Sequence, residues 1–251
     1  MDTKAYLKRI GYRGRVRPSA DVLRRLHRDH LLSIPFENLD IHRGRSIILS
    51  ENAFYDKIIK HHRGGFCYEL NGFFASLLDE LGFNLSMLSA RVARKSGGFS
   101  PEFDHMTLLV QLKRPWLVDV GFGDSFTEPK RLDVSGPQAD HGRDYRFTSK
   151  DGRTILSRRL TRNGAWEPSY LFCLRPRRLE DFMPRCRWQQ TSPKSHFREG
   201  RVCTRLTSNG RLTLTDTKFI MTRGARKVER PVKNAEEFAG LLRQHFGIEL
   251  S

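Results

Sequence analysis

The stretch HHRGGFCYELNGFF, residues 61–74, sets one cysteine between a glycine pair and an amphipathic segment. Apolar residues recur from Phe66 at the 3.6-residue period of a helix, and the pattern stops near Gly82. This spacing predicts a helix that begins close to Cys67. The cysteine is then either a small buried side chain that follows a turn, as free cysteines often are, or a nucleophile that the turn presents.

The segments on either side of this helix predict a chain that is helical at first and then rich in strands. Residues 19–32 and 50–62 carry serine caps and apolar residues at helical spacing. From about residue 85 onward, short apolar alternations separated by turn formers predict strands. A hairpin across residues 207–215 and a helix from Asn234, with Glu237 completing a capping box, follow. Segregated helices and strands predict the α+β class.

Composition and charge restrict the class of protein. The 251 residues include 45 Lys and Arg against 28 Asp and Glu, a formal net charge of +17, and 38% are hydrophobic. The basic residues form short scattered clusters without a helix-turn-helix, zinc-finger or RNP-type motif, so a nucleic-acid partner rests on charge alone. Apolar runs fall far below the roughly 18 residues of a membrane helix, and the first residues lack a secretory signal. The four cysteines lack zinc-ligand spacing, so we expect no metal. Since neither a membrane helix nor a secretory signal is predicted, we expect a cytoplasmic globular protein.

A catalytic thiol would need a base and an acid that orients the base. The start of a helix favours a thiolate, so we expect this position to lower the pKa of Cys67. His105 opens the strand at 105–112, and Asp119 stands among apolar residues in WLVDVGF, residues 116–122. A carboxylate in such surroundings is costly unless it is paired, and an imidazole N–H is a natural partner. Alternatively, His105 is only a strand-end histidine and Asp119 accepts backbone or arginine hydrogen bonds.

Four segments carry a more specific signal. They are IPFENL (34–39), RGGFCYELNGFF (63–74), the strand that begins at His105, and VDVGFG (118–123). Their order and spacing resemble those of the arylamine N-acetyltransferases. The resemblance runs from YLKRIGY near the N-terminus to QTSPKSHF (190–197), and the C-terminal part matches only loosely in a chain that is short for the family.

The resemblance implies a helical bundle over residues 1–84 that carries the nucleophile, a β-barrel over 85–185 that carries the histidine and aspartate, and an α/β lid over 186–251. In such a protein Cys67 would accept the acetyl group from acetyl-CoA, His105 would be its base, and Asp119 would orient that base. The implied reaction is the N-acetylation of arylamines, arylhydrazines or hydrazides by a ping-pong mechanism through an acetyl-cysteine thioester.

Further residues fall at family positions. We expect Glu37 and Arg63 to form a bidentate ion pair that supports the cysteine loop. Aromatic walls for the acceptor are expected from Phe36, Phe66 and Phe122, although core packing would explain the same residues. The candidates for contact with coenzyme A are Lys194, Ser195, His196 and Phe197.

Other functions stay open at this point. The same fold could serve an amide synthase that releases a carrier-bound polyketide, and the Cys-His-acid order also fits a papain-like hydrolase. A basic nucleic-acid-binding protein is the alternative without an enzyme activity. The sequence leaves the oligomeric state open.

Overall fold

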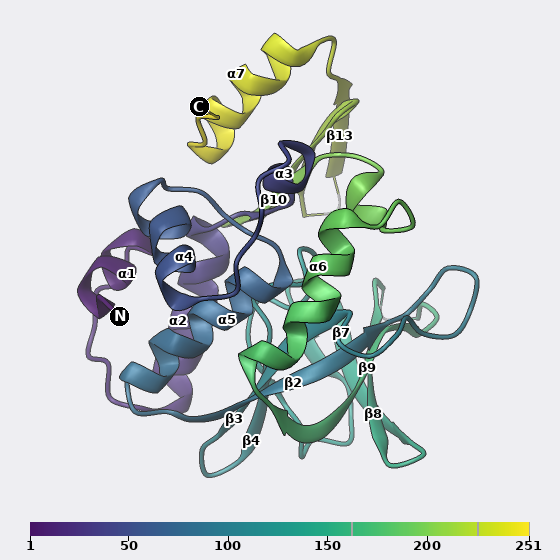
Figure 1. Cartoon of the computed structure of the whole chain (residues 1–251). Helices are drawn as coiled ribbons and strands as arrows, with labels where there is room; N and C mark the ends of the chain where they lie inside the picture. The colour runs from purple at the N-terminus through teal and green to yellow at the C-terminus, as the bar shows by residue number, and fades with distance from the viewer. Residues whose placement is uncertain (162, 225, 251) are drawn as a thin grey trace.

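The computed structural model describes residues 1–161, 163–224 and 226–250, and a helical region comes first (Figure 1). Its elements are α1 (Thr3–Arg9), α2 (Ala20–Ser33), α3 (Leu39–His42), α4 (Glu51–Tyr55), the π-helix Asp56–Lys60 that continues α4, and α5 (Cys67–Glu80). Ser19 and Ser50 cap α2 and α4, because their side-chain oxygens accept hydrogen bonds from the backbone N–H groups of Val22 and Ala53. The helices predicted at residues 19–32 and 50–62 are confirmed.

An antiparallel sheet of eight strands follows, with the spatial order β5-β4-β3-β2-β9-β8-β7-β6. Its strands are β2 (Asn84–Val92), β3 (His105–Gln111), β4 (Pro115–Val118), β5 (Lys130–Arg131), β6 (Gln138–Asp140), β7 (Arg143–Lys150), β8 (Arg153–Arg159) and β9 (Glu167–Arg177). The side-chain amide of Gln138 joins the two edge strands by hydrogen bonds of 2.9 and 2.8 Å to the backbone of Arg131. The sheet is therefore a nearly closed barrel.

A smaller antiparallel sheet has the order β1-β10-β11-β12-β13. Its strands are β1 (Phe36–Glu37), β10 (Val202–Thr207), β11 (Gly210–Thr215), β12 (Lys218–Arg223) and β13 (Arg226–Pro231). Helix α7 (Ala235–Phe246) packs against it, and Phe238 and Leu242 meet Leu214 and Phe219 in a separate small core. Figure 1 shows α7 beside this sheet, and α6 (Met183–Thr191) lies in front of the barrel.

Helix α5 is the central element, since it lies between the other helices and the barrel. The main core joins Phe73 and Leu77 of α5 to Leu26 of α2, Leu108 of β3 and Val118 of β4. Each side chain of this size contributes about 1.5–3 kcal/mol when it is fully buried. This core fixes the start of α5 against the end of β4, which is where Cys67 and Asp119 stand.

The α+β fold predicted from the sequence is confirmed, and so are the hairpin around Ser208 and Asn209 and the Asn234 cap of α7. Glu237 accepts from the backbone N–H of Lys233 rather than completing a box with Asn234. The division at residues 85 and 186 stays a prediction. Residue 186 lies inside α6, and β1 from the first segment pairs with β10 from the last.

No helix in the described ranges is long and apolar enough to cross a membrane.

Candidate active site

Cys67 is the first residue of α5, and two close backbone approaches hold it there. A Cβ atom on Gly64 would lie 1.9 Å from the carbonyl oxygen of Pro35, so the turn before the helix accepts only glycine at that position. A Cβ atom on Gly121 would lie 2.8 Å from the Cα of Cys67 and 2.6 Å from the Asn71 amide nitrogen. The loop after β4 is therefore packed directly on the start of α5.

His105 and Asp119 form a buried pair at 2.7 Å between His105 Nε2 and Asp119 Oδ2. The other oxygen, Asp119 Oδ1, accepts hydrogen bonds from the Asn71 amide at 2.9 Å and from the Gly121 N–H at 3.0 Å. Burial alone would raise the pKa of Asp119, but the charge of His105 and these hydrogen bonds outweigh it and lower the pKa. The carboxylate thus stays ionised and fixes the imidazole ring.

Asn71 and His27 support this pair, and the sequence analysis did not single them out. The amide of Asn71 also donates to the Met106 carbonyl at 2.7 Å and accepts from the Val120 N–H at 2.9 Å, which ties α5 to β3 and to the loop after β4. The ring of His27 contacts the Asp119 backbone from the other side, with 3.1 Å from Nε2 to the carbonyl oxygen. Asn71 lies in the sequence block RGGFCYELNGFF around Cys67. Its position in that block is the sequence signal that could have predicted its role.

The thiol of Cys67 is buried, and burial raises its pKa well above the usual value despite a favourable backbone contact at Met106. The prediction that the helix start lowers this pKa is wrong for the resting thiol. Desolvation of the thiolate outweighs the helix dipole because almost no water reaches the sulfur. A raised pKa favours the protonated thiol, so a nucleophilic Cys67 would need a base close to its sulfur.

A cavity of about 600 Å³ opens over these groups. Its wall includes Cys67, His105, Phe36, Phe122, His196 and Phe197. Phe122 packs edge-on against the imidazole of His105, with ring centroids 5.2 Å apart. Of the aromatic residues predicted for the acceptor pocket, Phe36 and Phe122 line the cavity.

Phe66 lies elsewhere: its side chain is fully buried in the core and packs against Tyr68 and Phe197 at centroid distances of 5.0 and 5.6 Å. Phe66 belongs to a buried cluster with Tyr68, Met106 and Phe182, so the core-packing alternative describes it.

The four residues predicted to contact coenzyme A divide into two pairs. His196 and Phe197 line the cavity. Ser195 is buried, and its hydroxyl donates to the Gln189 side chain at 2.6 Å, so its hydrogen-bonding capacity is used inside the protein. Lys194 is exposed in the turn before them and is not among the described residues that line the cavity.

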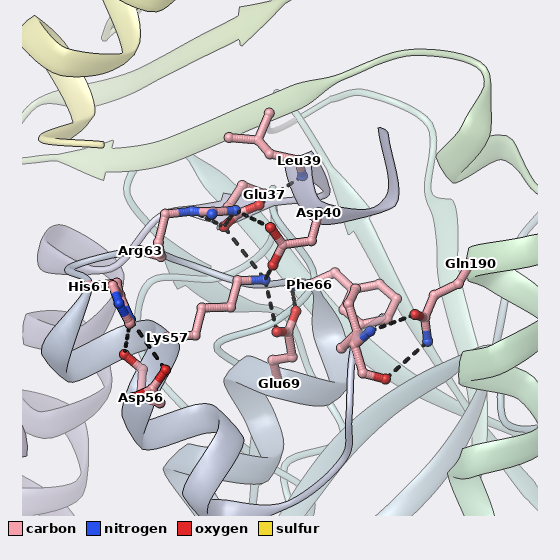
Figure 2. Close-up of polar contacts among 11 residues, drawn as sticks. Glu37, Leu39, Asp40, Asp56, Lys57, His61, Arg63, Phe66, Glu69 and Gln190 are labelled. Atoms are coloured by element: carbon pink, nitrogen blue, oxygen red, sulfur yellow. Dashed lines mark hydrogen bonds and ion pairs between the residues drawn. The ribbon is translucent and has the colours of Figure 1, made fainter. Parts of the chain in front are cut away.

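Glu37 and Arg63 are paired and buried, as predicted, but with a different geometry (Figure 2). Both Arg63 Nε, at 3.0 Å, and Nη2, at 2.7 Å, donate to the same oxygen, Glu37 Oε1. The second oxygen accepts from the Leu39 N–H at 2.8 Å, so the pair is not bidentate on both oxygens. Arg63 also reaches Asp40 at 3.0 Å.

Lys57 completes this cluster of buried charges, and the sequence analysis missed it. Its ammonium lies 2.8 Å from Asp40 and from Glu69, and 3.7 Å from Glu37 (Figure 2). Burial alone would lower the pKa of Lys57, but the three carboxylates raise it above its usual value. Glu69 in turn accepts from the Phe66 N–H at 3.0 Å, so the cluster holds the first turn of α5.

Replacing Lys57 with methionine is expected to destabilise the protein by about 3 kcal/mol, because the buried carboxylates of Glu37, Asp40 and Glu69 would lose the ammonium that lies among them. Urea denaturation measures the loss. The matched control is Lys60→Met, whose exposed ammonium pairs with Asp56 and should change stability by less than about 1 kcal/mol. Equal stability of the two variants would contradict the role assigned to Lys57.

The fold and the cavity together define a class of protein in which a buried cysteine at a helix start shares a cavity with a histidine that is paired with an aspartate. Sequence comparisons are more specific. A family model described as N-acetyltransferase matches residues 19–251. Arylamine N-acetyltransferase / N-hydroxyarylamine O-acetyltransferase from Salmonella typhimurium is 35% identical over 97% of this chain and 88% of its own length. The arylamine N-acetyltransferase of Mycolicibacterium smegmatis is 34% identical, with 100% and 93% covered.

The solved structures agree. The arylamine N-acetyltransferase of Mycobacterium marinum, solved in complex with CoA, has a TM-score of 0.91 at 31% identity, and the match covers 98% of this chain and 93% of that one. The chain belongs to the arylamine N-acetyltransferase family, and the resemblance noted in the sequence is confirmed.

Proposed function

We propose that this protein transfers the acetyl group of acetyl-CoA to the nitrogen of arylamines, arylhydrazines or hydrazides by way of Cys67. The observation that carries the proposal is that Cys67 and His105 line the same cavity beside Phe122, while Asp119 holds the His105 ring from behind. The names of the relatives support arylamines as acceptors, and the relative solved with CoA supports a CoA thioester as the donor.

In the first half-reaction His105 takes the proton of the Cys67 thiol. Nε2 of His105 is held by Asp119, which leaves Nδ1 as the nitrogen that accepts this proton. The sulfur attacks the thioester carbonyl, and the backbone N–H at the start of α5 stabilises the oxyanion. The C–S bond to CoA then breaks, His105 gives the proton to the leaving thiolate of CoA, and the acetyl group remains on Cys67.

In the second half-reaction the acceptor nitrogen attacks the acetyl-cysteine. His105 removes a proton from the nitrogen as the tetrahedral intermediate forms and delivers it to the Cys67 sulfur as that bond breaks. Asp119 stabilises the imidazolium in both halves. The raised pKa of the buried thiol fits this scheme, since the sulfur is a neutral leaving group at the end of the cycle.

Mixing the protein with acetyl-CoA in the absence of an amine should add the mass of one acetyl group, and peptide mapping should place it on Cys67. Adding aniline should then discharge the group as acetanilide. Steady release of acetate without any amine would instead indicate a hydrolase, and acetylation of lysines alone would show that the intact protein reacts only nonspecifically.

A further inference from the structure

Asp104 directly precedes His105 in the chain and lines the same cavity as His105 and Cys67. The residue is buried, and a carboxylate in such surroundings is costly unless its charge is paired. How each of its two oxygens is used therefore decides what Asp104 can do in the cavity.

The chain adopts an unusual conformation immediately before Asp104. Phe103 has a φ of +65°, in the left-handed region that favours glycine and is costly for a bulky side chain. Its N–H donates to the Ser89 hydroxyl at 2.7 Å, and its carbonyl oxygen accepts from the Tyr68 hydroxyl at 2.7 Å. Tyr68 follows Cys67 on α5, so these hydrogen bonds hold Asp104 in place relative to the nucleophile.

Helix α6 binds one oxygen of Asp104. Oδ1 accepts from Arg185 Nε at 2.7 Å and from the Gln189 amide at 2.5 Å, and Nη2 of the same arginine lies 2.6 Å away. The orientation of the Gln189 amide is fixed, because its oxygen accepts from the Ser195 hydroxyl at 2.6 Å. The guanidinium group pairs the charge, and both donor side chains converge on Oδ1.

The other oxygen, Oδ2, accepts no hydrogen bond from the described residues and is not one of their fully buried unpaired atoms. Asp104 lines the cavity while its Oδ1 is bound to α6, so Oδ2 is the oxygen that a molecule in the cavity can use. The next residue, His105, offers Nδ1 in the same cavity. Two consecutive residues thus provide a proton acceptor and a separate hydrogen-bond acceptor.

The charge of Asp104 disfavours the first half-reaction. Burial is the main cause of the raised pKa of the Cys67 thiol, and the charge of Asp104 raises this pKa further. A negative charge near the sulfur opposes formation of the thiolate that attacks the donor. In the second half-reaction the attacking nitrogen gains positive charge instead, and a carboxylate beside it is favourable.

We propose that Asp104 is a catalytic residue of the second half-reaction and that its Oδ2 accepts a hydrogen bond from the attacking amine. A primary amine carries two N–H groups. As the nitrogen attacks the acetyl-cysteine, one proton passes to Nδ1 of His105, while the other N–H donates to Oδ2 and remains in the amide product. Holding both N–H groups leaves the lone pair free to face the acetyl carbon. This inference rests on the proposed function.

Asp104→Asn tests the proposal, because the hydrogen bonds of Oδ1 determine how the new amide would lie. Arg185 and Gln189 donate to Oδ1, so the amide oxygen takes that place and the NH₂ group replaces Oδ2. The variant keeps the shape of the cavity wall but offers the amine a donor instead of an acceptor. The protein is acetylated with acetyl-CoA and freed of CoA, and loss of the acetyl mass is followed after addition of aniline or of CoA.

Discharge by aniline should be about ten- to a hundredfold slower in Asp104→Asn than in the wild type, the effect of losing one hydrogen bond to a charged group. Discharge by CoA should be at least as fast as in the wild type. A thiol has one proton, which passes to His105, and it has no second hydrogen to donate to Oδ2. The difference between the two acceptors separates this role from a structural one, since a displaced His105 would slow both reactions.

Glu102→Gln is the matched control. Glu102 lies two residues earlier, is exposed, pairs with Arg177 at 2.8 Å and is not among the described residues that line the cavity. Both of its discharge rates should equal those of the wild type. Equal slowing of both reactions in Asp104→Asn would mean that Asp104 acts through His105 or α6 and not on the amine, which would overturn the proposal.

Acetylation of Cys67 distinguishes the failure of this inference from failure of the proposed function. A wild-type protein that forms no acetyl-cysteine with acetyl-CoA contradicts the proposed function, and the role of Asp104 fails with it. If acetyl-cysteine forms and Asp104→Asn transfers it to aniline as fast as the wild type does, only the role of Asp104 fails.

Discussion

Replacing Cys67 with alanine is expected to abolish acetyl transfer, with a loss on the order of 10⁴ to 10⁶ in kcat. The loss should be large because the proposed mechanism binds the acetyl group covalently between the two half-reactions, and Cys67 is the only cysteine among the described residues that line the cavity. The rate of acetanilide formation from acetyl-CoA and aniline measures the effect. The variant should also fail to gain the acetyl mass when amine is absent.

Cys173→Ala is the control for this experiment. Cys173 is half-buried on β9 and is not among the described residues that line the cavity over Cys67, so its loss should leave kcat nearly unchanged. Both variants should unfold at similar temperatures, since a cysteine-to-alanine change removes little volume. Substantial turnover by Cys67→Ala would mean that acetyl transfer proceeds directly from donor to acceptor.

The sequence predicted the parts of the fold that depend on local pattern. Helix α2 has a serine cap and a regular apolar face, and α5 has the same face after its glycine pair, so periodicity placed both. Helix α6 escaped prediction because its apolar residues follow no helical period: it includes Pro184 near its start and only Cys186 and Gln189 are buried. The π-helix after α4 was also outside what periodicity describes.

The candidate site also has features that the local sequence predicts and features that depend on residues distant in the chain. Pairing of His105 with Asp119 could be anticipated because a lone carboxylate among apolar residues demands a partner. The expectation of a lowered pKa for Cys67 was wrong because burial raises the pKa of its thiol. That burial comes from residues distant in sequence, such as Gly121, which packs on the Cα of Cys67. Lys57 was missed for a related reason: its carboxylate partners come from β1, α3 and α5, and no local pattern brings them together.

Replacing Asp119 with asparagine should lower kcat/KM by a factor on the order of 10³ to 10⁴, although the shape of the site is retained. The hydrogen bonds already present determine how the amide would be oriented. Oδ1 of Asp119 accepts from two donors, the Asn71 amide and the Gly121 N–H. The oxygen of the new side chain must occupy that place, which turns its NH₂ group toward Nε2 of His105.

An NH₂ group facing Nε2 selects the wrong tautomer of His105. Nε2 must then accept, so the ring proton moves to Nδ1, the nitrogen that would otherwise take the proton of Cys67. The variant should therefore lose both the base and the negative charge that stabilises imidazolium. Alkylation of Cys67 by iodoacetamide, followed against pH, gives a second readout: its midpoint should lie higher in the variant than in the wild type.

Asp144→Asn provides the matched control, because Asp144 pairs with Arg159 on the barrel surface at 2.8 Å and is not among the described residues that line the cavity. Its alkylation midpoint and kcat/KM should equal those of the wild type. If Asp119→Asn alkylates with an unchanged midpoint while its turnover falls, the carboxylate acts only on a later step, and its assignment as the group that orients His105 for proton removal from Cys67 would be incorrect.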